Sequence, residues 1–148
     1  MPWWLDTRDK PGLLWALLQH CMGAGRVSLE GNLRPFGILD LPGSTHEETE
    51  LLRRHTVLPR QDFVILPISP ETLSTLKRKL SVSGLFNDGG AIWHVQIEHQ
   101  GRQVFGAYDN FHRHCVIAYE PIPIALLDEL VSIGVLRSYQ QAPDRTPR

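Results

Sequence analysis

The chain has little cysteine and no long apolar run. Two cysteines, Cys21 and Cys115, are too few and too far apart for the disulfide framework of a small secreted domain, so we expect reduced thiols. No apolar stretch approaches the roughly 20 residues that a membrane-spanning helix needs. The first ten residues lack the basic start and apolar core of a signal peptide. We therefore expect a cytoplasmic protein with no membrane partner.

An excess of charge of either sign is also absent. Fifteen basic and 16 acidic residues give a formal net charge of -1. Nucleic-acid-binding domains commonly carry a strongly basic face, and the short basic run 77–79 is better explained as the solvated end of a helix. The sequence therefore predicts no nucleic-acid partner.

Motifs of known chemistry are missing as well. The glycines between residues 84 and 90 match neither the P-loop pattern nor the dinucleotide-binding pattern. No His, Cys, Asp or Glu spacing matches a complete zinc site, which needs three or four convergent ligands. We expect no cofactor and no bound metal.

The 148 residues are most simply one domain with a core of its own. Hydrophobic periodicity and capping residues predict helices over 9–24, 45–55, 69–80 and 124–133. Alternating or continuous apolar runs predict strands over 26–33 and 62–68, a hairpin and third strand within 91–119, and short strands at 36–41 and 135–139.

Because the strands of 91–119 form a meander, the predicted fold class is α+β. We expect a mainly antiparallel sheet with helices packed on it. The single domain is predicted to span residues 1–139. Residues 81–90 are expected to form a loop, and residues 140–148 a disordered C-terminal tail.

Two segments carry specific expectations. Over residues 26–33, Val27 and Leu29 face one way while Ser28 and Glu30 face the other, which predicts a half-buried strand. Thr45 and Glu48 have the spacing of a capping box, which predicts an acidic surface helix ending near His55.

The register of the hairpin depends on its turn. A two-residue turn at Gln100 and Gly101 places Ile97 opposite Val104. Phe105 then shares the polar face of the hairpin with residues such as His94. A longer turn would shift this register.

The densest group of chemically active side chains follows the hairpin. His112 and His114 point the same way on an extended chain, and Asp109 and Arg113 lie beside them. Aromatic and arginine side chains are common anchors of protein interfaces. The candidate binding residues are Phe105, Asp109, Phe111, His112, Arg113 and His114.

Two alternatives remain open for the aromatic residues. Phe105 and Phe111 are either exposed anchors or core residues covered by a helix. Trp3 and Trp4 either pack beside the first helix near Trp15 or leave one ring exposed to a partner.

A second interpretation makes the chain a small hydrolase or transferase. Asp109, His112 and His114 would then carry out acid–base chemistry, with or without a metal ion. Cys115 is a less suitable nucleophile, because its neighbour His114 projects to the opposite face of a strand and is a poor base for it.

The absence of a catalytic motif and the residues of 105–114 favour a non-enzymatic module that binds another protein. Its most concrete form is a bacterial immunity protein that neutralises a cognate toxin. That form rests on the size and class of the chain.

Overall fold

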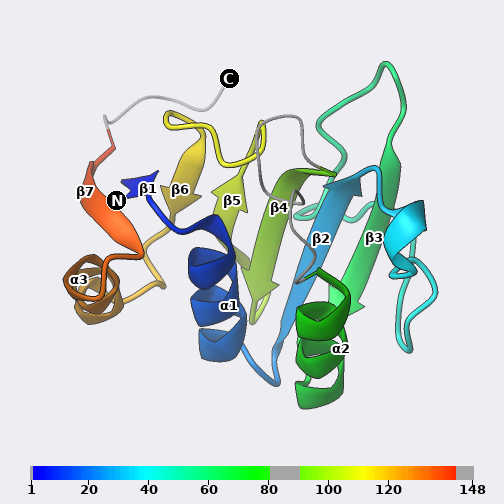
Figure 1. Cartoon of the computed structure of the whole chain (residues 1–148), viewed down its shortest axis with the longest axis horizontal. Coiled ribbons are helices and arrows are strands. Elements are labelled where there is room, and N and C mark those ends of the chain that lie inside the picture. The colour runs from blue at the N-terminus through cyan, green and yellow to red at the C-terminus, as the bar shows by residue number, and fades with distance from the viewer. Residues whose placement is uncertain (1, 81–90, 143–148) are drawn as a thin grey trace.

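A seven-stranded antiparallel sheet forms the centre of the computed structural model, which describes residues 2–80 and 91–142 (Figure 1). The strands are β1 (Trp3–Thr7), β2 (Gly25–Gly31), β3 (Asp62–Pro67), β4 (Ile92–His99), β5 (Arg102–Ala107), β6 (Val116–Ala118) and β7 (Leu136–Gln141). They lie in the order β3-β2-β4-β5-β6-β1-β7. The predicted α+β class is confirmed.

Three α-helices in the described part of the chain accompany the sheet: α1 (Lys10–His20), α2 (Pro70–Leu80) and α3 (Ile124–Ser132). The first two cover one face of the sheet, and α3 lies beside β7 (Figure 1). Asp9 caps α1, because its side chain accepts a hydrogen bond from Gly12 N at 3.0 Å. None of these described helices has the length and apolar character needed to cross a membrane.

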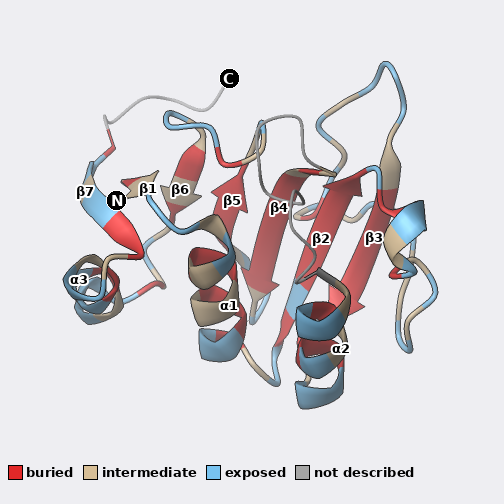
Figure 2. Cartoon of the chain, viewed as in Figure 1, coloured by how far each residue is buried: buried red, intermediate tan, exposed pale blue. Residues whose placement is uncertain are grey.

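The main core lies between the sheet and the helices. Leucines of α1 and α2 pack there against the apolar side chains of β2, β4 and β5. Figure 2 shows the central strands as almost continuously buried. The buried leucines of the two helices are Leu13, Leu14, Leu17, Leu18, Leu73 and Leu76.

The N-terminal strand β1 was not predicted. It lies between β6 and β7, with Trp3 edge-on to Tyr139 at a ring-centroid distance of 5.4 Å. Its partners are more than a hundred residues away, so no local pattern announces it. Trp3 pairs with Gln141, so β7 runs two residues into the predicted tail. Residues 143–148 and the predicted loop 81–90 lie outside the described residues.

The hairpin turn is at the predicted residues, but the register is shifted by one. His99 pairs with Arg102, and a bulge between Ile97 and Glu98 then brings Ile97 opposite Phe105. The predicted pairing of Ile97 with Val104 is therefore wrong, because an extra residue in one strand reverses the faces of all that follow. Phe105 lies on the core face as a result.

Two predictions over residues 36–61 are wrong; we call residues 44–61 of this stretch the strap. Neither the helix at 45–55 nor the strand at 36–41 forms. Thr45 instead exchanges two backbone hydrogen bonds with Ile65 on the outer edge of β3, at 3.0 and 2.8 Å. Glu48 accepts from Arg54 N rather than closing a capping box. These bonds pair the backbone N–H and C=O of Thr45 with the sheet edge, so these two groups do not need the hydrogen bonds of a helix.

The strap then crosses the sheet face opposite α1 and α2 (Figure 1). Leu52 is its apolar attachment, fully buried against Phe63 and Ile65 in a small cluster separate from the main core. Because the strap covers this side of the sheet, β2 is buried on both faces rather than half-buried as predicted.

Replacing Leu52 with alanine should destabilise the protein by about 2–5 kcal/mol, because the truncation leaves a cavity under the strap. Leu58→Ala is the matched control. It makes the same change in the same strap, at a side chain that is 89% exposed, and should alter stability by no more than about 0.5 kcal/mol. Chemical denaturation measures both. Equal effects would show that the strap is not packed on the sheet.

Candidate functional site

A band of polar side chains crosses the strap side of the sheet. β2 and β4 contribute it as successive cross-strand pairs. The alternation of the sequence indicates a polar face here, but not that the strap buries it. The pairs are Arg26 with Glu98, Ser28 with Gln96, and Glu30 with His94.

Glu30 attaches the strap to the sheet. Its side chain is 1% exposed, and its carboxylate accepts hydrogen bonds from His55 N at 2.8 Å and Thr56 N at 3.2 Å. A buried carboxylate is costly unless hydrogen-bond donors surround it. The strap supplies two such donors, so its path over β2 is tied to this one side chain.

His94, beside Glu30, uses both ring nitrogens. Nδ1 accepts from Asp109 N at 3.2 Å, and Nε2 lies 2.7 Å from Thr56 Oγ1. Because a backbone N–H can only donate, Nδ1 carries no proton and Nε2–H donates to Thr56. Burial lowers the pKa of His94, against the opposing influence of the Glu30 and Asp109 carboxylates. The ring is therefore neutral at pH 7.

Other polar side chains on this side of the sheet are also hydrogen-bonded within the protein. Gln96 Nε2 donates to Arg53 O at 2.6 Å, and Gln103 Nε2 donates to Tyr108 Oη at 3.2 Å. The Tyr108 ring lies over Gly106, where a Cβ atom would approach Tyr108 Oη to 2.6 Å. These groups hold the strap and leave little capacity for a substrate.

Two of the predicted binding residues lie in the core. Phe105 and Phe111 are buried, with ring centroids 6.2 Å apart. This is the alternative in which the aromatic side chains belong to the core, and neither ring is available at the surface as an anchor.

The other four predicted residues lie in an exposed segment, residues 109–114, which we call the turn. Asp109, Asn110 and Phe111 adopt positive φ values of 50, 56 and 58°. Three left-handed residues in succession curl the chain tightly, so that Phe111 enters the core while His112 to His114 remain outside. Asn110 N donates to Trp93 O at 2.7 Å and holds the turn on β4.

The histidines of the turn do not assemble a catalytic or metal-binding group. The His112 and His114 rings are 6.1 Å apart, centroid to centroid, and both side chains are exposed. Within residues 2–80 and 91–142, no three His, Cys, Asp or Glu side chains are placed to hold a metal ion together.

Cys115 is not arranged as a nucleophile. Its Sγ lies 3.9 Å from Asp109 Oδ2 and donates to it. Burial, followed by the Asp109 carboxylate, raises the pKa of the Cys115 thiol. Burial alone raises the pKa of Cys21 to about 11. Both cysteines are free and protonated at neutral pH, in agreement with the expected reduced thiols.

The apolar end of the strap is the surface feature that the sequence analysis missed. Residues 57–60, which we call the tip, include Val57 and Leu58, which are 87% and 89% exposed. The chain on either side is fastened, because Arg54 donates to Gln61 O and lies over the Phe63 ring. The sequence does contain an indication of this surface, because Val57 and Leu58 are adjacent apolar residues in an otherwise polar segment and are followed by a proline.

The tip and the turn project from the same end of the sheet (Figure 1). Their bases meet at His94, which bonds Thr56 of the strap and Asp109 of the turn. The His55 and Tyr108 rings add a second contact, with centroids 4.3 Å apart.

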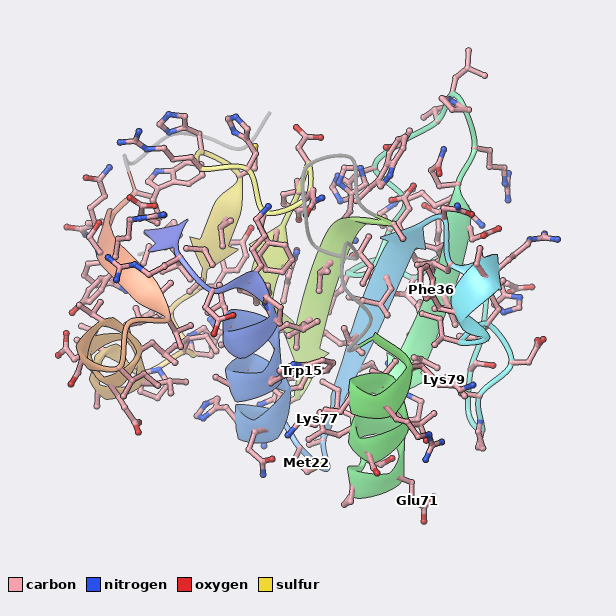
Figure 3. All side chains as sticks on the ribbon, viewed as in Figure 1. Trp15, Met22, Phe36, Glu71, Lys77 and Lys79 are labelled. Atoms are coloured by element: carbon pink, nitrogen blue, oxygen red, sulfur yellow. The ribbon has the colours of Figure 1, made fainter. Side chains whose placement is uncertain are left out.

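The helix side offers a weaker candidate surface. Trp15 of α1 and Met22, just beyond the end of that helix, lie toward α2, where Lys77 points between the helices (Figure 3). Both apolar side chains are only half-exposed and pack against the core. Their burial explains them without a partner.

Comparison of the chain with models of protein families, with curated proteins and with solved structures found no significant match.

Replacing Glu30 with glutamine should lower stability by about 1–3 kcal/mol, because the two strap N–H groups bond different carboxylate oxygens and glutamine replaces one of these oxygens with an NH2 group, which leaves one donor buried without a partner. Glu47→Gln removes the same charge from an exposed position on the strap and should be nearly neutral. Urea denaturation of both variants measures the difference. A Glu30→Gln protein as stable as Glu47→Gln would show that this carboxylate does not hold the strap.

Asp109→Asn should speed alkylation of Cys115 by iodoacetamide at neutral pH, because removing the carboxylate lowers the thiol pKa and increases the thiolate fraction. In the wild type, the rate should rise as the pH is raised. Asp40→Asn, an exposed aspartate, is the control. Peptide mass spectrometry separates Cys115 from buried Cys21. A wild-type Cys115 that reacts faster than a free thiol would reopen its assignment as a nucleophile.

Proposed function

We propose that this protein is a non-enzymatic module that binds another protein through the tip and the turn. The observation that carries the proposal is the exposure of Val57 and Leu58, 87% and 89%, on a strap whose two sides are fastened. Burying such a side chain contributes about 1.5–3 kcal/mol, which favours a partner with an apolar pocket.

The attachment of the strap strengthens this argument. The Glu30 carboxylate and Thr56 hold one side of the tip, and the contacts of Arg54 with Gln61 and Phe63 hold the other. A loop that is already ordered loses less conformational entropy on binding. The tip is therefore presented in one arrangement rather than as a freely moving loop.

The strap as a whole carries three glutamates and three arginines, but the arginines lie nearer in sequence to the tip, and this favours an acidic partner. Arg53 and Arg60 of the strap and Arg113 of the turn are all exposed, and none of them is in an ion pair within the described part of the chain. Asp109 is the acidic residue of the turn, and it already accepts from Cys115. Carboxylates around the apolar pocket of the partner would speed association and set specificity.

Neutralisation of a cognate bacterial toxin in the cytoplasm is the most specific form of this proposal. An immunity protein works by covering a surface of its toxin, for which an ordered, self-contained surface is sufficient. This form is supported by the size and α+β class of the chain and by its formal net charge of -1, which is close to neutral.

The hydrolase or transferase alternative has less support. Both nitrogens of His94 are engaged, the thiol of Cys115 is held protonated, and the histidines of the turn face solvent. A general base needs a free nitrogen or oxygen within reach of a substrate.

Leu58→Asp tests the proposal. A charge inserted into the apolar pocket should weaken binding by about 2 kcal/mol or more, roughly thirtyfold in Kd. The matched control is Ile133→Asp, which places the same charge at a 65% exposed position at the end of α3, away from both loops.

The measurement begins with quantitative capture from cells of the source organism by wild type, Leu58→Asp and Ile133→Asp. The affinity of each variant for the purified captured protein is then measured by calorimetry. A partner carrying a toxin domain, lost with Leu58→Asp and kept with Ile133→Asp, supports the specific form. A partner that binds wild type and Leu58→Asp equally would place the interface elsewhere.

A further inference from the structure

His94 couples the two loops of the proposed interface. One ring nitrogen bonds the strap at Thr56 and the other bonds the turn at Asp109 N, while the ring itself is only 5% exposed. The side chain thus joins two segments more than fifty residues apart in sequence. The bond to Asp109 N requires the neutral ring with Nδ1 unprotonated, whereas the bond to Thr56 requires only a proton on Nε2.

We propose that His94 is a pH-sensitive pin: its protonation in mildly acidic solution frees the amide of Asp109 and loosens the turn, while the strap stays attached. Any effect of the loosened turn on partner binding rests on the function proposed above. The conformational step concerns the protein alone and does not depend on it.

The geometry makes the two bonds respond differently. Adding a proton to Nδ1 places an N–H group opposite the N–H of Asp109, at the present separation of 3.2 Å. Two donors cannot share that contact, so either the turn or the ring must move. Nε2 already carries its proton and continues to donate to Thr56, and Glu30 continues to accept from His55 N and Thr56 N.

The charged and titratable groups around the ring set the direction of the switch. The Glu30 carboxylate on β2 and the Asp109 carboxylate on the turn favour the protonated ring, whereas burial and His55 on the strap oppose it. Tyr108, with its ring centroid 5.9 Å away, has a pKa raised to about 12 by burial and stays neutral. Burial outweighs the carboxylates, so the pKa of His94 is lowered.

The sign of the linked stability follows. Because the pKa of His94 in the folded protein lies below its ordinary value of 6.5, the unfolded chain takes up the proton first as the pH falls. The stability contributed by the neutral ring is complete above the ordinary pKa. It declines as the pH falls from there to the folded-state pKa, and then levels off.

Nuclear magnetic resonance of the isolated protein tests the switch. The His94 ring signals and the hydrogen-exchange protection factor of the Asp109 amide are followed from neutral pH to about pH 5, after correction for intrinsic exchange. We expect Asp109 protection to fall about tenfold or more, with the midpoint of the His94 titration. Protection of Leu29 and Val95, in the paired strands β2 and β4, should stay constant.

Two variants separate the pin from general effects of acid. His94→Asn keeps an acceptor near the position of Nδ1 but cannot titrate, so Asp109 protection should become independent of pH. His114→Asn removes an exposed histidine of the same turn and should leave the response intact. Should His94→Asn fold poorly, the wild-type titration still decides: constant Asp109 protection while His94 titrates overturns the proposal.

This result is independent of the partner experiment. If Asp109 responds but Leu58→Asp does not affect binding, the switch stands and the assigned interface fails. If Leu58→Asp abolishes binding while Asp109 protection does not change with pH, the interface stands and the pH-sensitive pin is wrong. Loss of the response in His114→Asn would assign the titration to the turn itself.

Discussion

The buried carboxylate of Glu30 is the group on which the strap side of the molecule depends. A carboxylate that is 1% exposed needs hydrogen-bond donors around it, and the backbone of the strap supplies two, at His55 and Thr56. The strap therefore follows one path over β2, and that path places Thr56 against His94. The position of the tip follows from this attachment.

The strap combines two kinds of contact with different consequences. Leu52 forms a small apolar cluster with Phe63 and Ile65. The polar contacts at Glu30 and His94 bury little apolar area. They fix the path of the strap over the sheet, because hydrogen bonds form only at defined distances and angles. An apolar tip on so ordered a base is suited to recognition, whereas a loose loop of the same composition would lose more entropy on binding.

The candidate site was partly predictable. Polar residues alternate in 26–30 and 94–98, which indicates a polar face on each strand, but only the pairing of β2 with β4 joins the two faces into one band. The assignment of Phe105 to this face was wrong because of a single bulge at Ile97, which depends on packing across the sheet. The exposure of Leu58 could not be predicted for another reason. Whether a single leucine is buried or exposed depends on which other segments pack over it, and the sequence does not display this.

The local pattern of the sequence determined much of the architecture. Leucine periodicity and capping residues specify α1 and α2, and apolar runs bounded by turn residues specify β3 and the hairpin. These elements depend on interactions between near neighbours in the chain, which a sequence displays directly.

Only the tertiary structure decided the rest. β1 forms because Trp3 and Trp4 find partners in β6 and β7, more than a hundred residues away. The strap does not become a helix because Thr45 pairs with Ile65 and Glu30 binds its backbone. In each case the stabilising contact joins residues distant in sequence, so its free energy appears only once the sheet has assembled.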